Sequence, residues 1–132
     1  MKTPVKRLEA KADKAWSEAI RARDGKCIIC GRKSNLQAHH AINRRGKKAT
    51  RWDLRNGITL CVKCHLFGIH GNQVDGEFHD NYIVARNISI PEYIQEELRV
   101  IGNKIFKTDI VGMENIILAL EANKEISDKG IK

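Results

Sequence analysis

Aromatic residues are scarce in this chain of 132 residues: three Phe, two Trp and two Tyr make up 5% of the sequence. This scarcity excludes a core built mainly from aromatic rings, although the hydrophobic content of 42% is ordinary for a soluble globular protein. The length allows one compact domain, which buries only about two thirds of the surface that its unfolded chain exposes. A crosslink, such as a bound metal ion, would therefore help to stabilise the fold.

Long apolar runs are also missing. No stretch approaches the roughly 18 apolar residues that a membrane-spanning helix needs. The basic N-terminus leads into a segment in which alanines alternate with charged residues, so a signal peptide is not expected. There is no internal repeat and no low-complexity segment. We expect a soluble cytoplasmic protein without a membrane partner.

Cysteine is absent outside two Cys-x-x-Cys pairs, which are Cys27 with Cys30 and Cys61 with Cys64. This usage favours an intracellular metal site over a disulfide framework. Four thiolates typically hold zinc in a closed tetrahedral site, where the ion is structural rather than catalytic and its binding is coupled to folding. The alternatives are an iron–sulfur cluster and a redox-active cysteine pair.

Acidic residues are scarce in the first half of the chain. Residues 1–70 contain 17 Lys and Arg against 5 Asp and Glu, a net charge of +12, and residues 71–132 contain 7 against 11, a net charge of −4. A basic field limited to one half favours a polyanionic partner such as nucleic acid, because neutralised phosphates release condensed counterions. The alternatives are a solvated basic surface and binding to anionic lipid.

Periodicity predicts an α+β fold with a small ββα core. Apolar residues recur at helical spacing between Thr3-Pro4, a start signal, and Asp24-Gly25, where glycine can provide a left-handed cap. Short strands are expected at 36–41 and 58–60, with Asn56-Gly57 as a turn and a short helix after the second strand. We expect a single domain over residues 1–132, composed of a basic helix (1–24), a zinc-stapled core (25–71) and a helical extension (72–132).

The helical extension is predicted to contain helices at 77–85, 91–101 and 109–125. Thr108 is the expected cap of the last helix, and residues 126–132 are expected to fray. One face of that helix has an apolar stripe: Ile110, Met113, Ile116, Ile117 and Leu120. We interpret the stripe as core, with a dimer face as the alternative.

Residues 44–51 contain no apolar side chain larger than alanine, which predicts an exposed loop. Five of its eight residues are cationic: Arg44, Arg45, Lys47, Lys48 and Arg51. We interpret them as contacts to a nucleic-acid backbone rather than as a passive solvated loop. Cations on a loop read little base information, so they favour weak sequence specificity.

The order of the Cys, His and Asn residues between residues 27 and 65 resembles that of HNH endonucleases, ββα-metal nucleases common in bacteriophages and mobile elements. The resemblance is concentrated in His39-His40, in Asn56 before a strand, and in the Cys-Val-Lys-Cys-His run that ends at His65. It covers roughly residues 25–71. It implies a His-Me-finger core, hydrolysis of DNA phosphodiester bonds and a catalytic divalent metal beside the structural zinc.

The resemblance also implies roles for single residues. His39 corresponds to a ligand of the catalytic metal and His40 to the general base, and adjacent strand residues do point to opposite faces. Asn56 would pin the loop and orient His40, and His65 would be a second metal ligand. Many relatives have Asp where this chain has His39, and a nitrogen donor broadens the expected metals from Mg²⁺ to Mn²⁺, Ni²⁺, Co²⁺ or Zn²⁺.

His70 lies five residues after His65, which on a regular helix places it about 140° around the axis. Relatives commonly have a further metal-binding His four residues on, so ligation by His70 requires the helix to break, and Gly68 could provide that break. His79 is assigned no role.

These residues predict a metal-dependent HNH endonuclease that nicks or cuts DNA as a monomer or weak homodimer, in the host cytoplasm if a phage encodes it. One alternative is a phage recombination nuclease that acts on branched DNA. Another is a zinc-ribbon-like module that binds nucleic acid without cutting it.

Overall fold

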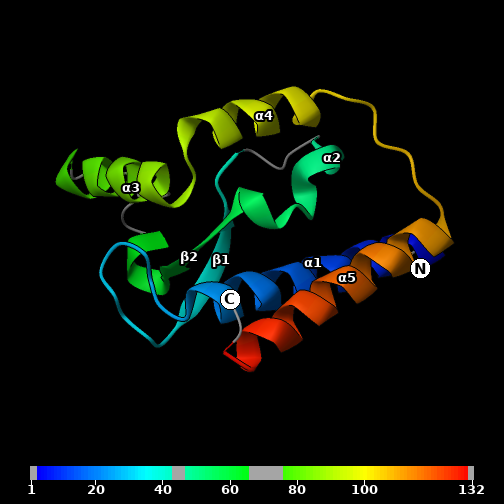
Figure 1. The fold of residues 1–132 in the computed structure, drawn as a ribbon, viewed down its shortest axis with the longest axis horizontal. Coiled ribbons are helices and arrows are strands. Elements are labelled where there is room, and N and C mark those ends of the chain that lie inside the picture. The colour runs from blue at the N-terminus through cyan, green and yellow to red at the C-terminus, as the bar shows by residue number, and fades with distance from the viewer. Residues whose placement is uncertain (1–2, 43–46, 66–75, 131–132) are drawn as a thin grey trace.

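The computed structural model describes residues 3–42, 47–65 and 76–130, with the side chains of residues 76–81 excepted (Figure 1). A two-stranded antiparallel sheet lies between two groups of helices, so the predicted α+β class is confirmed. Arg44, Arg45 and His70 lie outside the described residues.

The first helix, α1 (Pro4–Asp24), begins and ends where the sequence predicts. The Thr3 side chain accepts a hydrogen bond from the Lys6 amide, and Pro4 occupies the first helical turn, where no intrahelical partner is lost. Gly25 ends the helix at φ 68°, in the left-handed region that glycine adopts without strain. Figure 1 shows α1 beside the last helix, under the sheet.

Strand β1 (Leu36–His40) pairs with β2 (Gly57–Cys61), each within one residue of its predicted bounds. The register places His39 opposite Ile58 and His40 opposite Gly57. Because side chains alternate along a strand, His39 and Ile58 share one face of the sheet, and His40 shares the other face with Gly57 and Thr59.

The segment between the strands is more ordered than an exposed loop. Residues Lys48–Arg51 form the short helix α2, and Leu54–Asn56 form the 3-10 turn η1. Thr50 is fully buried, so the expectation of exposure throughout residues 44–51 was wrong for this part. The physical reason is that Glu9 and Asp13 of α1 form ion pairs with Lys48 and Arg51 and hold α2 against the rest of the protein.

Three further helices form the C-terminal region: α3 (Gly76–Ser89), α4 (Glu92–Gly102) and α5 (Ile110–Asp128). The cap of α5 is Asp109, whose carboxylate accepts from the Gly112 amide, and not Thr108. The helix also continues through residues 126–128, which were expected to fray. Among the described residues, no helix is both long and apolar enough to cross a bilayer.

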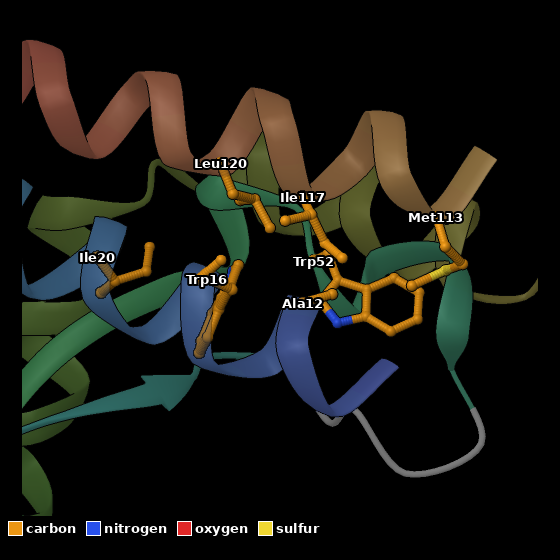
Figure 2. Packing of buried hydrophobic residues seen from close by; sticks show 8 residues of the cluster. Ala12, Trp16, Ile20, Trp52, Met113, Ile117 and Leu120 are labelled. Carbon is orange, nitrogen blue, oxygen red and sulfur yellow. The ribbon is translucent and has the colours of Figure 1, made fainter. Parts of the chain in front are cut away.

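One hydrophobic cluster joins α1, α5 and Trp52. Figure 2 shows Met113, Ile117 and Leu120 pointing from α5 toward α1, with the Trp52 ring between the two helices. The predicted core stripe is thus confirmed for these three residues and for the partly buried Ile116. Ile110 is 44% exposed and does not belong to it.

A second cluster lies on the opposite face of the sheet. Ile58 and Leu60 of β2 are fully buried there, together with Tyr82 of α3 and Leu98 of α4. The cluster continues into the buried cysteines, so this core and the cysteine cluster are one packed unit. The sheet therefore separates two cores, and each face of β1 meets different helices.

The contact between Gly57 and α1 leaves no room for a side chain. A Cβ at Gly57 would overlap Ile20 Cδ1 and lie 2.7 Å from the Trp16 ring. We predict that Gly57→Ala lowers the free energy of unfolding by about 1–3 kcal/mol through overpacking, measured by denaturant unfolding. Gly102→Ala is the control, because its Cβ would have its nearest contact at 3.5 Å. Equal stability of the two variants would contradict the close packing of α1 on β2.

Candidate active site and metal centre

The four cysteines converge at one end of the sheet. Their Sγ atoms all lie within 4.8 Å of one another, and the Cys30 and Cys61 Sγ atoms are 3.6 Å apart. Metal–sulfur bonds of about 2.3 Å in a tetrahedral site require sulfurs about 3.8 Å apart. The donor set and its spacing therefore fit a metal ion with four thiolate ligands.

Local hydrogen bonds shape the first cysteine turn before any metal is considered. The Cys27 amide donates to the Arg32 carbonyl over 2.8 Å, and the Gly31 amide donates to the Cys27 carbonyl over 2.9 Å. Gly31 has φ 79°, which a residue with a side chain adopts only with strain. The Ile28 amide then donates to the Thr59 carbonyl of β2. These bonds fix the turn against the strand that leads to Cys61.

The surroundings of the cluster shift the pKa values of Cys27 and Cys64 in opposite directions. Burial raises the pKa of Cys27, but amide hydrogen bonds from Cys30, Cys61 and Ile29 outweigh it, and its pKa is lowered to about 7. Burial and the neighbouring sulfurs raise the pKa of Cys64. A cation at the centre would favour all four thiolates, so its binding releases protons.

The His40 ring is held on two sides. Its Nε2 lies 2.8 Å from the Arg51 carbonyl oxygen, and its ring stacks on Trp16 with centroids 3.9 Å apart and planes 7° apart. A carbonyl oxygen only accepts hydrogen bonds, so Nε2 donates. In the neutral ring the lone pair is then on Nδ1, the nitrogen that can take up a proton.

His39 points to the other face, toward α3 and the residues after β2. Its ring centroid is 5.1 Å from that of His65, and its Nε2 lies 3.4 Å from the Tyr82 hydroxyl. The His65 Nδ1 donates to Gln37 Oε1 over 2.7 Å, which leaves the lone pair of the neutral ring on Nε2. Burial raises the pKa of Tyr82 against the opposing effect of Arg86, so its hydroxyl stays protonated at neutral pH.

Asn56 is fully buried and joins both ends of the inter-strand segment. Its Oδ1 accepts from the Ile42 amide over 2.7 Å, and its Nδ2 donates to the carbonyls of Ile42 and Thr50, both over 3.2 Å. Removing a buried amide with three such bonds leaves main-chain groups without partners. Asn56 thus fixes the segment that contains the Arg51 carbonyl.

The cations predicted to contact nucleic acid have protein partners where they are described. The Lys47 Nζ donates to Asn103 Oδ1 over 2.6 Å, and the Lys48 Nζ lies 3.1 Å from Glu9 Oε2. Arg51 is bound by Asp13 and by Glu9. The structure thus attaches this segment to α1 and α4, and a role for these cations in nucleic-acid binding stays a prediction.

Sequence reasoning missed three neighbours of the histidines. Trp16 was assigned only to the apolar face of its helix, and Asp13 and Tyr82 were not considered. Asp13 had one available signal, since it is among only five acidic residues in the first 70. Nothing local links Trp16 to His40 or Tyr82 to His39, because these pairs are 24 and 43 residues apart in sequence.

Comparison with known proteins gives one family. Residues 27–66 match the family model for HNH endonucleases, which confirms the resemblance over the segment that contains both cysteine pairs and the histidines. No curated protein and no solved structure matches the chain. The match supports a nuclease that acts on nucleic acid.

Loss of one thiolate should unfold the metal centre. We predict that Cys61→Ser binds less than one metal ion per chain and loses its cooperative thermal transition, because Cys61 is 1% exposed and closes the cluster. Metal content by mass spectrometry and circular dichroism provide the two measurements. Ser34→Ala, at an exposed position after the first turn, is the control. A wild-type transition for metal-free Cys61→Ser would contradict a structural metal.

Proposed function

We propose that this chain, which contains an HNH endonuclease domain over residues 27–66, is a metal-dependent endonuclease that hydrolyses DNA phosphodiester bonds with weak sequence specificity. The observation that carries the proposal is the arrangement at the end of β1. His40 is oriented by a main-chain carbonyl on one face, and His39 faces His65 on the other. A phosphodiester lying across this end of β1 would have His40 on one side and His39 with His65 on the other.

His40 is the proposed general base. Its Nδ1 lone pair can accept a proton from the attacking water, while the Nε2 bond to Arg51 and the stack on Trp16 hold the ring in place. A base that is already oriented loses little conformational entropy when the reaction begins. The imidazole works near neutral pH because its ordinary pKa is close to that range.

His39 and His65 are the proposed protein ligands of the catalytic divalent metal. Gln37 orients His65 through its Nδ1, which is the usual way in which the outer shell fixes a metal-binding imidazole. When bound, such a metal stabilises charge on the phosphate and on the leaving oxygen. Two nitrogen ligands suit Mn²⁺, Ni²⁺, Co²⁺ or Zn²⁺ as well as Mg²⁺. Zinc is the proposed ion of the four-cysteine site, where it has no catalytic role.

The first test is direct. Purified protein is incubated with supercoiled plasmid, linear duplex, single strand and four-way junction, with each divalent metal in turn and with EDTA. Metal-dependent cleavage of the plasmid or the duplex supports the proposal. Binding without cleavage in every metal would contradict it and favour a non-catalytic module, and cleavage of the junction alone would make branched DNA the substrate.

The base assignment predicts a loss of rate. His40→Ala should lower kcat by about 100- to 10,000-fold, because general-base catalysis contributes about that much. DNA affinity, measured by fluorescence anisotropy on the zinc-loaded protein without added divalent metal, should stay within about twofold of wild type, as expected for a residue that acts mainly in the transition state. A wild-type rate of plasmid nicking by His40→Ala would disprove the assignment.

The ligand assignment predicts a different pattern. His65→Ala should raise the Mn²⁺ concentration needed for half-maximal cleavage by at least about tenfold, and excess Mn²⁺ should restore part of the rate. Excess Mn²⁺ should not restore His40→Ala. The same metal dependence for His65→Ala and wild type would remove His65 from the metal site.

A further inference from the structure

The helix α1 lies outside the HNH match, yet it holds the inter-strand segment through two acidic side chains. Asp13 binds Arg51 with both carboxylate oxygens, at 2.9 Å from Nε and 2.5 Å from Nη2. The same carboxylate accepts from Trp52 Nε1 over 3.0 Å. Glu9, one turn earlier on the same face, lies 3.1 Å from the Lys48 Nζ and 3.5 Å from Arg51 Nη1.

These bonds fix the main chain that orients the proposed base. The helix α2 has only four residues, so the carbonyls at its end accept hydrogen bonds from donors outside the helix, as the Thr50 carbonyl does from the Asp53 amide. Asn56 donates to the Thr50 carbonyl, and His40 donates to the Arg51 carbonyl. The side chain that Asp13 holds and the carbonyl that His40 uses therefore belong to the same residue.

Trp16 adds a second link from the same helix. It lies three residues after Asp13, on the same face of α1, and stacks on the His40 ring. Its Nε1 donates to the Asp53 carbonyl over 3.0 Å, just beyond α2, and the side chain is 3% exposed. The ring of Trp16 is thus itself fixed, and it limits the positions that the His40 ring can take.

We propose that α1 is part of the catalytic apparatus, with Asp13 as a positioning residue that acts through Arg51 and with Trp16 as the platform for His40. This inference rests on the proposed function for its kinetic test. It assigns Arg51 a role in the protein rather than on DNA. The orientation and tautomer of His40 then depend on a salt bridge whose carboxylate, that of Asp13, lies outside the HNH match.

Asp13→Asn removes the charge that holds Arg51 while preserving the shape of the side chain. We expect kcat for plasmid cleavage to fall by about 10- to 100-fold, because a misplaced base loses about that much rate. The KM for DNA should change less than about twofold, since the interaction lost is made in the transition state. Glu18→Gln is the matched control: Glu18 lies on the same helix, pairs with Lys14 and has the same 32% side-chain exposure as Asp13.

Arg51→Lys provides the conservative variant. Lysine keeps the charge but cannot form the two-pronged bond to a carboxylate, so kcat should fall between those of wild type and Arg51→Ala. If Asp13 and Arg51 act through the same interaction, the double variant Asp13→Asn/Arg51→Ala should cleave no more slowly than Arg51→Ala alone. Fully additive losses in the double variant would overturn the proposal.

A spectroscopic measurement tests the positioning without cleavage. Nitrogen-15 spectra of His40 are recorded with the four-cysteine site loaded with zinc and with no other divalent metal added. They should show the Nε2–H tautomer in wild type and Glu18→Gln, and a mixture of tautomers in Asp13→Asn. The spectra are recorded below the melting temperature of each variant, so that unfolding does not imitate the effect. A single Nε2–H tautomer in folded Asp13→Asn would overturn the proposal.

Measurements of DNA binding distinguish the positioning role of Arg51 from a direct contact with DNA phosphate. If Arg51 binds a DNA phosphate, Asp13→Asn should free its side chain and tighten DNA binding. Arg51→Ala should then weaken DNA binding, and the slope of log K against log salt concentration should fall by about one. That pattern would overturn the proposal, whereas unchanged affinity in both variants supports it. If wild type cleaves no DNA with any metal, the proposed function fails, and the tautomer measurement still decides the role of Asp13.

Discussion

The register between β1 and β2 is the constraint on which the rest of the structure depends. Its Leu36–Cys61 end leads into the cysteine cluster, where four sulfurs lie within 4.8 Å of one another. Its His40–Gly57 end is closed by Asn56, which is bonded to Ile42 and Thr50. A shift of one residue would send His39 and His40 to the wrong faces, because side chains alternate along a strand. The cysteine cluster and Asn56 therefore both fix the register that keeps the two histidines on opposite faces of the sheet.

This alternation gives the two faces of one short strand different chemistry. His40 enters the tightly packed side formed by α1, where a stacked ring and a carbonyl restrict it. His39 enters the side of α3, where Tyr82 and His65 surround it with polar atoms. A general base benefits from a fixed ring, and a metal ligand benefits from neighbours that leave room for other ligands. The sheet thus places the proposed base, His40, and its neighbour His39, a proposed metal ligand, on opposite faces.

The part of the chain outside the HNH match supports the site in two ways. The α1–α5 core holds the helix that meets one face of the sheet, and α3 and α4 bury Ile58 and Leu60 on the other. Electrostatics adds a specific contribution, because two of the five acidic residues in the basic half, Glu9 and Asp13, lie on α1 and pair with Lys48 and Arg51. The segment that contains these cations is consequently held against α1, and its charge is partly neutralised within the protein.

The sequence by itself determined the cysteine cluster, the strand that contains His39 and His40, the caps of α1 and the core residues of α5, because spacing and periodicity are local properties of the chain. Sequence reasoning placed the cap of α5 at Thr108 rather than Asp109. It also missed the helix α2, because the partners of the cations in residues 44–51 lie far away in the sequence. Only the tertiary structure decided that Trp16 stacks on His40, that Asp13 holds Arg51 and that Tyr82 reaches His39. These contacts join residues 24 to 43 positions apart, and their geometry follows from how the helices pack on the sheet.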